Sequence, residues 1–378
     1  MKFPTTLDRY ILKEHISPFI GGIGVLSFIM LLDYFIRLAD LVVRKNVPLL
    51  TVGKLVIYLL AFILTMSVPM SVLIASLVVY GRMSQDFETL AAKSLGISLR
   101  RLALAPLVAA FLLFIFMTWF NLEVSPESNY RLRMLLSEIS RKKPISQIEA
   151  GRFTQIKDYR IFVERKNERT SELFGIKLNE PLKNGIVRVI IAKYGKLITK
   201  GDTIIMVMID GEIHEPTSPD LQLYRTVKFT RHIVKIPISE EMASVKSKYR
   251  SPRERRAKQL LKEIREINPA TARDTVEANW LRTKKSRLIV EFNKRISLAF
   301  AGIVFVLIAV PIATIARRGG YGTAFGISFL VFTFYYIIMI ASEDFAKKGM
   351  MNPYIASWLP NIVTAVIGAI LFIKEEKA

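Results

Sequence analysis

Six long apolar runs constrain this chain more than any other feature of its sequence. The runs are Ile16–Leu32, Leu55–Gly81, Leu102–Leu122, Ile296–Ala316, Gly319–Ser342 and Gly349–Ile373. The last five contain no Asp, Glu, Lys or Arg, and charged residues bracket each one. A bilayer core of about 30 Å requires about 20 apolar residues, so each run is long enough to span it. The pattern therefore predicts an α-helical membrane protein with six transmembrane helices.

The only long polar segment lies between the third and fourth runs, from Glu123 to Arg295. Three spans precede it and three follow it, which predicts a soluble domain inserted into a three-plus-three membrane domain. We expect the boundaries to divide the chain into 1–122, 123–295 and 296–378. A hydrophobic content of 51% over 378 residues agrees with a membrane protein better than with two soluble domains.

Composition excludes several kinds of site. The chain has no cysteine, so disulfides and thiolate metal sites are excluded. Its three histidines, His15, His214 and His232, lie in different segments, so we expect neither a metal nor another cofactor. The net charge of +22 is concentrated in residues 123–295, which hold 37 Lys and Arg against 22 Asp and Glu. A basic domain tethered to a membrane is expected to face anionic lipid rather than nucleic acid.

Lysine and arginine are distributed unequally between the two sides of the expected spans. Near the spans, eleven lie on the side of the chain ends and six on the other side, with the long central segment left out. This bias predicts that both ends are cytoplasmic and that the central domain lies outside the inner membrane. No small-residue cleavage site follows the first run, so we expect an uncleaved signal anchor.

The second, third and fourth runs contain Pro69, Pro106 and Pro311. A proline inside a helix removes one backbone hydrogen bond and leaves a carbonyl free. We expect kinks at these positions, with the freed carbonyls bonded to groups on neighbouring helices.

The loop between the second and third runs, Arg82–Arg101, contains a short amphipathic segment. With Gly81 ending the preceding helix, a helix is predicted over Asp86–Leu95, and Gly96 is its expected C-terminal cap. One apolar face of this helix consists of Leu90, Ala91 and Leu95. Two interpretations remain open, namely a turn lying on the bilayer surface and a helix that docks into a groove on a soluble partner.

The central segment begins with a predicted helix over Asn129–Ser140 and then becomes β-rich. The β-rich runs are Arg160–Glu164, Glu172–Leu178, Ile186–Lys193, Thr203–Asp210 and Leu221–Ile236. Turn signals separate them at Asn184-Gly185, Gly201-Asp202 and Asp210-Gly211. Many short strands at this spacing predict an antiparallel sandwich or open barrel. Its apolar face could hold an acyl chain if the sheet does not close.

The end of the central segment returns to helical patterning. Ser251 is expected to cap a helix that reaches about Ile267, with Glu254 closing a capping box. A second, basic helical stretch then leads through Glu291 and Arg295 into the fourth span.

Several short motifs occur in a particular order along the chain. They are Leu7-Asp8-Arg9-Tyr10-Ile11, Glu88 with Gly96 and Ser98, Gly151-x-Phe153, Tyr224-Arg225-Thr226, and Glu291-x-x-x-Arg295 followed by Ile296 and Ser297. In this order, along a three-plus-three topology, they resemble the LptF/LptG (YjgP/YjgQ) permease family, the membrane subunits of the lipopolysaccharide-export ABC transporter. The resemblance covers nearly the whole chain, and its motifs do not separate an F-type from a G-type subunit.

The resemblance implies a periplasmic domain of β-jellyroll type and a paired permease in the bacterial inner membrane, whose second subunit is a paralogue or a second copy. It also implies a cytoplasmic ATPase dimer of LptB type that grips the loop helix, and periplasmic LptC/LptA-type jellyroll proteins. The sequence contains no GxxxxGKS or GxxxxGKT phosphate loop, so we expect that this chain is no enzyme and hydrolyses no ATP itself. The expected ATPase-coupling residues, in and beside a helix at about 84–97, are Arg82, Asp86, Glu88, Leu90, Ala91, Gly96 and Ser98.

Lipopolysaccharide is then expected to enter from the outer leaflet between two permease subunits, with its phosphates bound by basic residues near the outer surface. The expected phosphate-binding residues are Arg37, Arg44, Lys45, Arg131, Arg133, Lys294 and Arg295. Only Arg131 and Arg133 lie where the family places basic residues after the third span. The other five are inferred from charge and depth.

Two other functions remain open at this point. A mechanotransmitting permease of the lipoprotein-release type also carries a large outer domain, but such proteins usually have four spans per chain. A membrane-anchored scaffold that transports nothing would need the same spans, and co-purification with an ATPase would distinguish it from a transporter.

Overall fold

The computed structural model describes residues 5–43, 47–142, 148–156, 158–167, 170–181, 187–200, 203–216, 224–237, 250–271, 274–316 and 321–377. These residues divide into two compact units. The helical unit contains Met1–Tyr34, Val56–Tyr130 and Ser251–Ala378, and the sheet unit contains Phe35–Leu55 and Arg131–Arg250. The expected polar segment 123–295 is therefore shared between the two units, since its first and last parts group with the spans.

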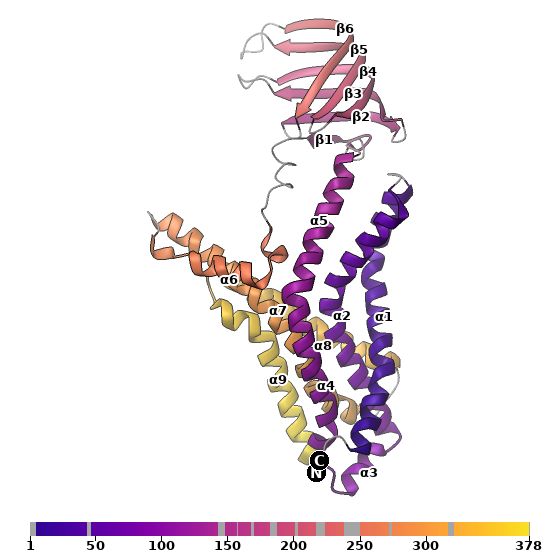
Figure 1. Ribbon diagram of the computed structural model, residues 1–378, viewed down its shortest axis with the longest axis vertical. Coiled ribbons are helices and arrows are strands. Elements are labelled where there is room, and N and C mark those ends of the chain that lie inside the picture. Colours follow the sequence, from indigo (N-terminus) through magenta and orange to yellow (C-terminus); the bar gives the residue numbers. More distant parts are fainter. Residues whose placement is uncertain are drawn as a thin grey trace. The chain divides into compact units, whose positions relative to one another are not determined.

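The α-helices of the described chain are α1 (Thr6–Val43), α2 (Leu49–Gln85), α3 (Glu88–Ser94), α4 (Leu99–Trp119), α5 (Ser125–Lys142), α6 (Ala257–Glu266), α7 (Thr275–Ala316), α8 (Tyr321–Lys347) and α9 (Pro353–Lys377) (Figure 1). Six stretches of the described residues are long and apolar enough to cross a membrane: Thr6–Ile36, Leu49–Gln85, Leu99–Ile139, Thr275–Ala316, Gly322–Lys347 and Pro353–Glu376. The predicted fold class, six membrane helices with an inserted antiparallel sheet, is confirmed.

The third span continues without a break into the polar segment. A π-helical turn, η1 (Phe120–Val124), joins α4 to α5, so no new helix begins at Asn129 as the sequence suggested. The buried Asn121 in this turn donates a hydrogen bond to the Arg295 carbonyl oxygen in α7, at 3.0 Å. The irregular turn therefore fixes α4 to α7.

Two prolines in the spans leave carbonyls that side chains of neighbouring helices satisfy. Pro106 in α4 cannot donate to the Leu102 carbonyl four residues earlier, and the buried Tyr80 hydroxyl in α2 donates to that oxygen at 2.8 Å. Pro360 in α9 likewise frees the Ala356 carbonyl, which accepts a hydrogen bond from Ser342 Oγ in α8 at 2.8 Å. In a bilayer, where no water is available to these groups, such bonds hold the bundle together.

The core of the helical unit forms around α2 and α7, the two most buried of the described spans, whereas α1 and α8 are the least buried. Tyr80, Leu102, Phe305 and Tyr335 are fully buried in one apolar cluster. The rings of Phe305 and Tyr335 meet edge to face with centroids 5.2 Å apart, which places part of the aromatic-rich fifth span in the core.

The segment before α7 forms two short helices instead of the single expected helix from Ser251 to about Ile267. The capping box exists, since the Ser251 amide donates to Glu254 Oε2 at 3.1 Å, but it closes only one 3₁₀ turn, η4 (Pro252–Glu254). Arg255 is extended, and α6 starts at Ala257. Arg295 stabilises this interruption, because its guanidinium donates to the carbonyl oxygens of Pro252, Arg253 and Arg255.

The sheet unit contains an antiparallel meander of six strands in the described residues, ordered as in the sequence (Figure 1). The strands are β1 (Phe153–Ile156), β2 (Tyr159–Asn167), β3 (Glu172–Pro181), β4 (Val187–Lys200), β5 (Thr203–Pro216) and β6 (Tyr224–Pro237). The four-residue β1 was not expected, and β4 and β5 extend beyond the runs that the sequence indicated. Buried side chains such as Ile161, Ile176, Ile190 and Met206 form its apolar core.

The turn expected at Asp210-Gly211 does not exist, because β5 continues through both residues. Gly211 pairs with Ala192 on one side and Phe229 on the other. A Cβ at Gly211 would lie 2.1 Å from the Ile191 carbonyl oxygen, so only glycine fits between the strands. Asp210 adopts a left-handed conformation with φ of 53°. Strained strand positions therefore select the residue types that also favour turns.

We expect Tyr80→Phe to lower the free energy of unfolding by about 1–2 kcal/mol, because it leaves the Leu102 carbonyl without a donor. In a Pro106→Ala background the restored backbone amide can bond that carbonyl, so the same change should cost much less. Unfolding of the four purified proteins in detergent measures this coupling. Equal costs in both backgrounds would contradict the assignment of the Tyr80 hydroxyl to the proline site.

Candidate functional site

The loop between α2 and α4 contains α3, which is shorter than the helix expected over Asp86–Leu95. The second span does not end at Gly81, since α2 continues to Gln85. The chain then turns sharply at Phe87, whose φ of 59° is a left-handed conformation that costs a bulky residue about 1–2 kcal/mol. The turn leaves only Glu88–Ser94 as helix.

Gly96 caps α3 as the sequence predicts. Its φ is 81°, its amide bonds the Lys93 carbonyl at 2.9 Å, and the Ile97 amide bonds the Ala92 carbonyl at 3.0 Å. These two bonds form a Schellman motif. Ser98 then caps α4, since its hydroxyl accepts from the Arg101 amide at 3.3 Å. Both residues shape the turn from α3 into α4.

One face of α3 presents apolar side chains to the surroundings. Phe87, Leu90 and Leu95 are 67%, 59% and 80% exposed, whereas Thr89 and Ala92 on the other face are buried. Ala91 and Asp86 are also exposed. Sequence reasoning identified Leu90, Ala91 and Leu95 but missed Phe87, although an aromatic residue between Asp86 and Glu88 was the available signal.

Glu88 does not face outward with these side chains but is bonded to α1. The Tyr10 hydroxyl lies 3.0 and 3.1 Å from the two Glu88 carboxylate oxygens and accepts a hydrogen bond from Arg82 at 3.1 Å. Arg82 also pairs with Glu14 at 2.7 Å. The expected site residues Arg82 and Glu88 are thus brought together, through Tyr10 and Glu14, which the sequence analysis had not assigned to the site.

Further ion pairs join α3 and the start of α4 to the first and last helices of the chain, α1 and α9. Arg101 binds the buried carboxylate of Asp8 in α1 through both oxygens, at 2.6 and 2.8 Å. Lys93 binds Glu375 in α9 at 3.1 Å, and Arg100 binds Glu376. The start of α1, the end of α9 and α3 therefore lie at one end of the bundle (Figure 1).

The described members of the expected phosphate-binding set are divided between the two units. Arg131 is exposed and Arg133 is half-buried on α5 in the sheet unit, whereas Lys294 and Arg295 belong to α7 in the helical unit. Arg44, Lys45 and the side chain of Arg37 lie outside the described residues.

Lys294 and Arg295 are engaged with protein groups. Lys294 pairs with Glu343 at 2.8 Å. Arg295 is buried, and its guanidinium donates to the carbonyl oxygens of Pro252, Arg253 and Arg255 at 2.8–3.2 Å. It also donates to Glu291 at 3.2 Å. The three bonds to the carbonyls of residues 252–255 therefore hold the turn η4 against α7.

A hollow of about 810 Å³ on the sheet is lined by charges of both signs. Three cations, Arg165, Lys193 and Lys228, lie there with three anions, Glu164, Asp210 and Glu212. Lys193 donates to Asp210 at 2.8 Å, and this bond raises the pKa of Lys193. A charged lining of this kind does not suit an acyl chain.

The described residues contain no group of three His, Asp or Glu side chains that could hold a metal ion. At the α3 end, an exposed apolar helix face is fixed by charged hydrogen bonds to α1 and by caps that lead into α4.

Comparison with known proteins identifies the family. A search of curated proteins found no match. The family model described as "Lipopolysaccharide export system permease LptF/LptG" matches residues 9–374, essentially the whole chain. This multi-pass membrane protein therefore belongs to the LptF/LptG family of lipopolysaccharide export system permeases.

Proposed function

We propose that this chain is a permease subunit that takes lipopolysaccharide from the outer leaflet of the bacterial inner membrane and passes it towards a periplasmic bridge. The observation that carries the mechanism is the exposed face of α3, formed by Phe87, Leu90 and Leu95. The charged frame that holds it consists of Glu88, Tyr10, Arg82 and Glu14. A face of this kind suits a hydrophobic groove on a soluble partner. The proposed partner is a cytoplasmic ATPase dimer of LptB type.

The frame around α3 suggests how movement of the ATPase would reach the spans. Glu88 is bonded to α1 through Tyr10, α2 enters the turn directly at Phe87, and the Gly96 cap leads into α4. Lys93 adds a contact to α9. A displacement of the apolar face would therefore move several spans together, because each attachment is short and directional.

A second permease subunit, a paralogue or a second copy, is proposed to cover the membrane faces of α1 and α8. These are the least buried of the described spans, and they expose Phe28, Phe329 and Leu330 by 63–69%. Lipopolysaccharide would enter between the two subunits. Periplasmic LptC/LptA-type proteins would receive it from the sheet unit.

Arg131 and Arg133 are proposed to bind the lipopolysaccharide phosphates. They lie two residues apart on α5, beyond the apolar run Leu102–Leu122, where a headgroup would be found. Arg37, Arg44 and Lys45 remain proposals from charge and depth alone. Lys294 and Arg295 also remain proposals, and a phosphate there would have to compete with the carboxylate and carbonyl oxygens that they bind.

The topology predicts opposite compartments for the chain end and the sheet unit. Reporter fusions at Ala378 and at Thr217 should report cytoplasm and periplasm respectively, because the Lys/Arg bias places the ends inside. Finding both reporters in one compartment would contradict the topology and the proposed route.

Substitutions on α3 should separate docking from positioning. Leu90→Asp places a charge on the docking face and should release the ATPase from the purified permease, since burying an unpaired carboxylate is costly. Glu88→Ala and Tyr10→Phe should instead retain the ATPase while lowering export per ATP hydrolysed, and the double variant should be no worse than either single one.

Asp86→Ala is the matched control for these variants, because Asp86 is exposed beside the same helix. It should retain both the ATPase and export. Wild-type coupling in Glu88→Ala, with the ATPase still bound, would show that the Tyr10–Glu88 contact transmits no movement.

Reversal of both arginines on α5, in Arg131→Glu with Arg133→Glu, should weaken lipopolysaccharide binding. Charged hydrogen bonds of this kind contribute on the order of 1.5–3 kcal/mol each. The matched control reverses Arg225 and Arg231, exposed arginines of β6, and should bind normally. If the α5 variant retains lipopolysaccharide as tightly as wild type, these arginines do not bind its phosphates.

A further inference from the structure

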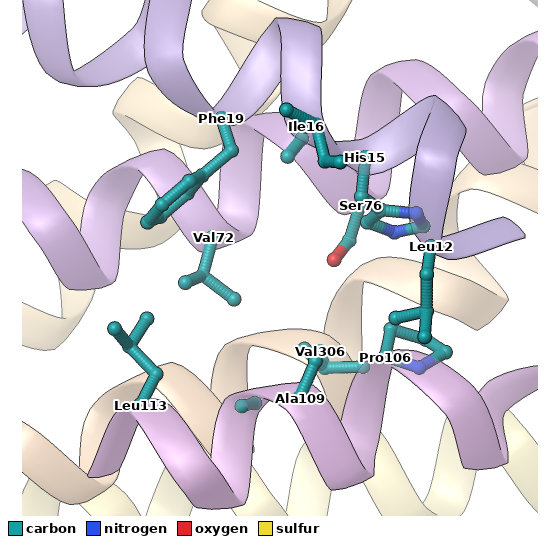
Figure 2. A pocket seen from close by; sticks show the side chains of 12 residues that line it. Leu12, His15, Ile16, Phe19, Val72, Ser76, Pro106, Ala109, Leu113 and Val306 are labelled. Atoms are coloured by element: carbon teal, nitrogen blue, oxygen red, sulfur yellow. The ribbon is translucent and has the colours of Figure 1, made fainter. Parts of the chain in front are cut away.

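A cavity of about 280 Å³ lies within the helical unit, between α1, α2, α4 and α7 (Figure 2). Its walls are almost entirely apolar and include Leu12, Phe19, Val72, Ala109, Leu113 and Val306. Apolar cavities of about 150 Å³ in soluble proteins stay dry and take up hydrocarbons. The volume here therefore suits an aliphatic chain segment.

Two polar atoms interrupt this apolar wall. The first is Ser76 Oγ in α2, on a fully buried side chain that points towards the cavity in Figure 2. Among the described residues it has no hydrogen-bond partner. Other serines in the spans behave differently, since Ser71 and Ser328 each donate to the carbonyl four residues earlier at 2.6 Å. Ser76 forms no such bond and keeps its donor available to the cavity.

The second polar atom is His15 Nε2 in α1. His15 Nδ1 lies 2.7 Å from the Ile11 carbonyl oxygen, and because a carbonyl only accepts, Nδ1 must carry the proton. The ring also packs edge to face on Tyr80, with centroids 5.8 Å apart, which fixes its orientation. Nε2 is buried and has no partner within the described part of the chain. In an apolar wall the neutral ring is favoured, so Nε2 is an acceptor.

The cavity therefore presents one acceptor and one hydroxyl beside an aliphatic space. A carbonyl or ether oxygen could accept from Ser76 but would leave His15 Nε2 facing another acceptor. A phosphate or carboxylate would bring an unpaired charge into apolar surroundings, which is costly. An alcohol satisfies both atoms, because its O–H donates to Nε2 while its oxygen accepts from Ser76 Oγ.

We propose that this cavity binds an aliphatic chain carrying a hydroxyl group, held between His15 Nε2 and Ser76 Oγ. The site lies at the α3 end of the bundle, since Glu14 beside His15 pairs with Arg82. An occupant would therefore touch α1, α2 and α4 close to the residues that hold α3. Binding at this cavity would be a property of the single chain and does not depend on the proposed transport function.

The test uses the full chain in nanodiscs of a saturated phosphatidylcholine, which has no hydroxyl group, with ¹⁵N-labelled histidine. The chain has only three histidines, so the His15 signal is assigned by comparison with His15→Phe. Addition of 1-decanol should shift the Nε2 resonance. Decane and 1-methoxydecane, which lack an O–H donor, should require at least about tenfold higher concentrations for comparable occupancy, as expected for the loss of one well-formed hydrogen bond.

Two variants separate the polar contact from the space. Ser76→Ala should weaken decanol binding several-fold. The variant should still bind decanol more tightly than methoxydecane, because His15 Nε2 still accepts from the O–H group. Ala109→Leu, at an exposed position of the cavity wall, should fill the space and abolish binding of decanol and decane alike. The proposal is overturned if wild-type chain binds decanol, methoxydecane and decane equally, or if decanol leaves the Nε2 resonance unchanged. Both of these outcomes are measured on the wild-type protein alone.

Discussion

The bundle depends on one constraint, which is that polar groups inside the spans must find their partners within the protein. Two prolines illustrate this constraint, because each leaves a backbone carbonyl in the bundle without its usual amide donor. Tyr80 satisfies the carbonyl freed by Pro106, and Ser342 satisfies the one freed by Pro360. These bonds connect different helices, so positions that break a helix become positions that join the bundle.

Charged and amide side chains also join different helices, through hydrogen bonds near the two ends of the spans. At one end the Asp8–Arg101 pair joins α1 to α4, and the Tyr10–Glu88 contact joins α1 to α3. Where the apolar part of α7 begins, Arg295 donates to carbonyls of the η4 segment, and Asn121 donates to the carbonyl of Arg295 itself. The two ends differ in what remains exposed. At the first end the apolar face of α3 stays exposed, whereas at the second end the guanidinium of Arg295 is bonded to backbone carbonyls.

The cavity beside His15 and Ser76 departs from this rule of internal satisfaction. Both atoms are buried and without partners in the described chain, while Ser71 in the same helix as Ser76 bonds back to the Ser67 carbonyl. A buried polar atom left unpaired is costly, so the departure itself indicates a ligand. The apolar walls and the fixed histidine tautomer then define the chemistry of that ligand.

The sequence by itself determined the six spans, their three-plus-three arrangement, the antiparallel sheet and the Gly96 cap, because hydrophobic runs, β-rich runs and glycine at a helix end act over short distances. It also carried the family resemblance and directed attention to Glu88 and Arg82. Only the tertiary structure decided which partners these residues have. Asp210-Gly211 looks like a turn but lies inside β5, and Arg295, predicted to bind phosphate, donates to the carbonyls of the η4 segment. In both cases groups distant in sequence settle the outcome: the close approach of Ile191 requires a glycine, and the carbonyls of residues 252–255 occupy the guanidinium.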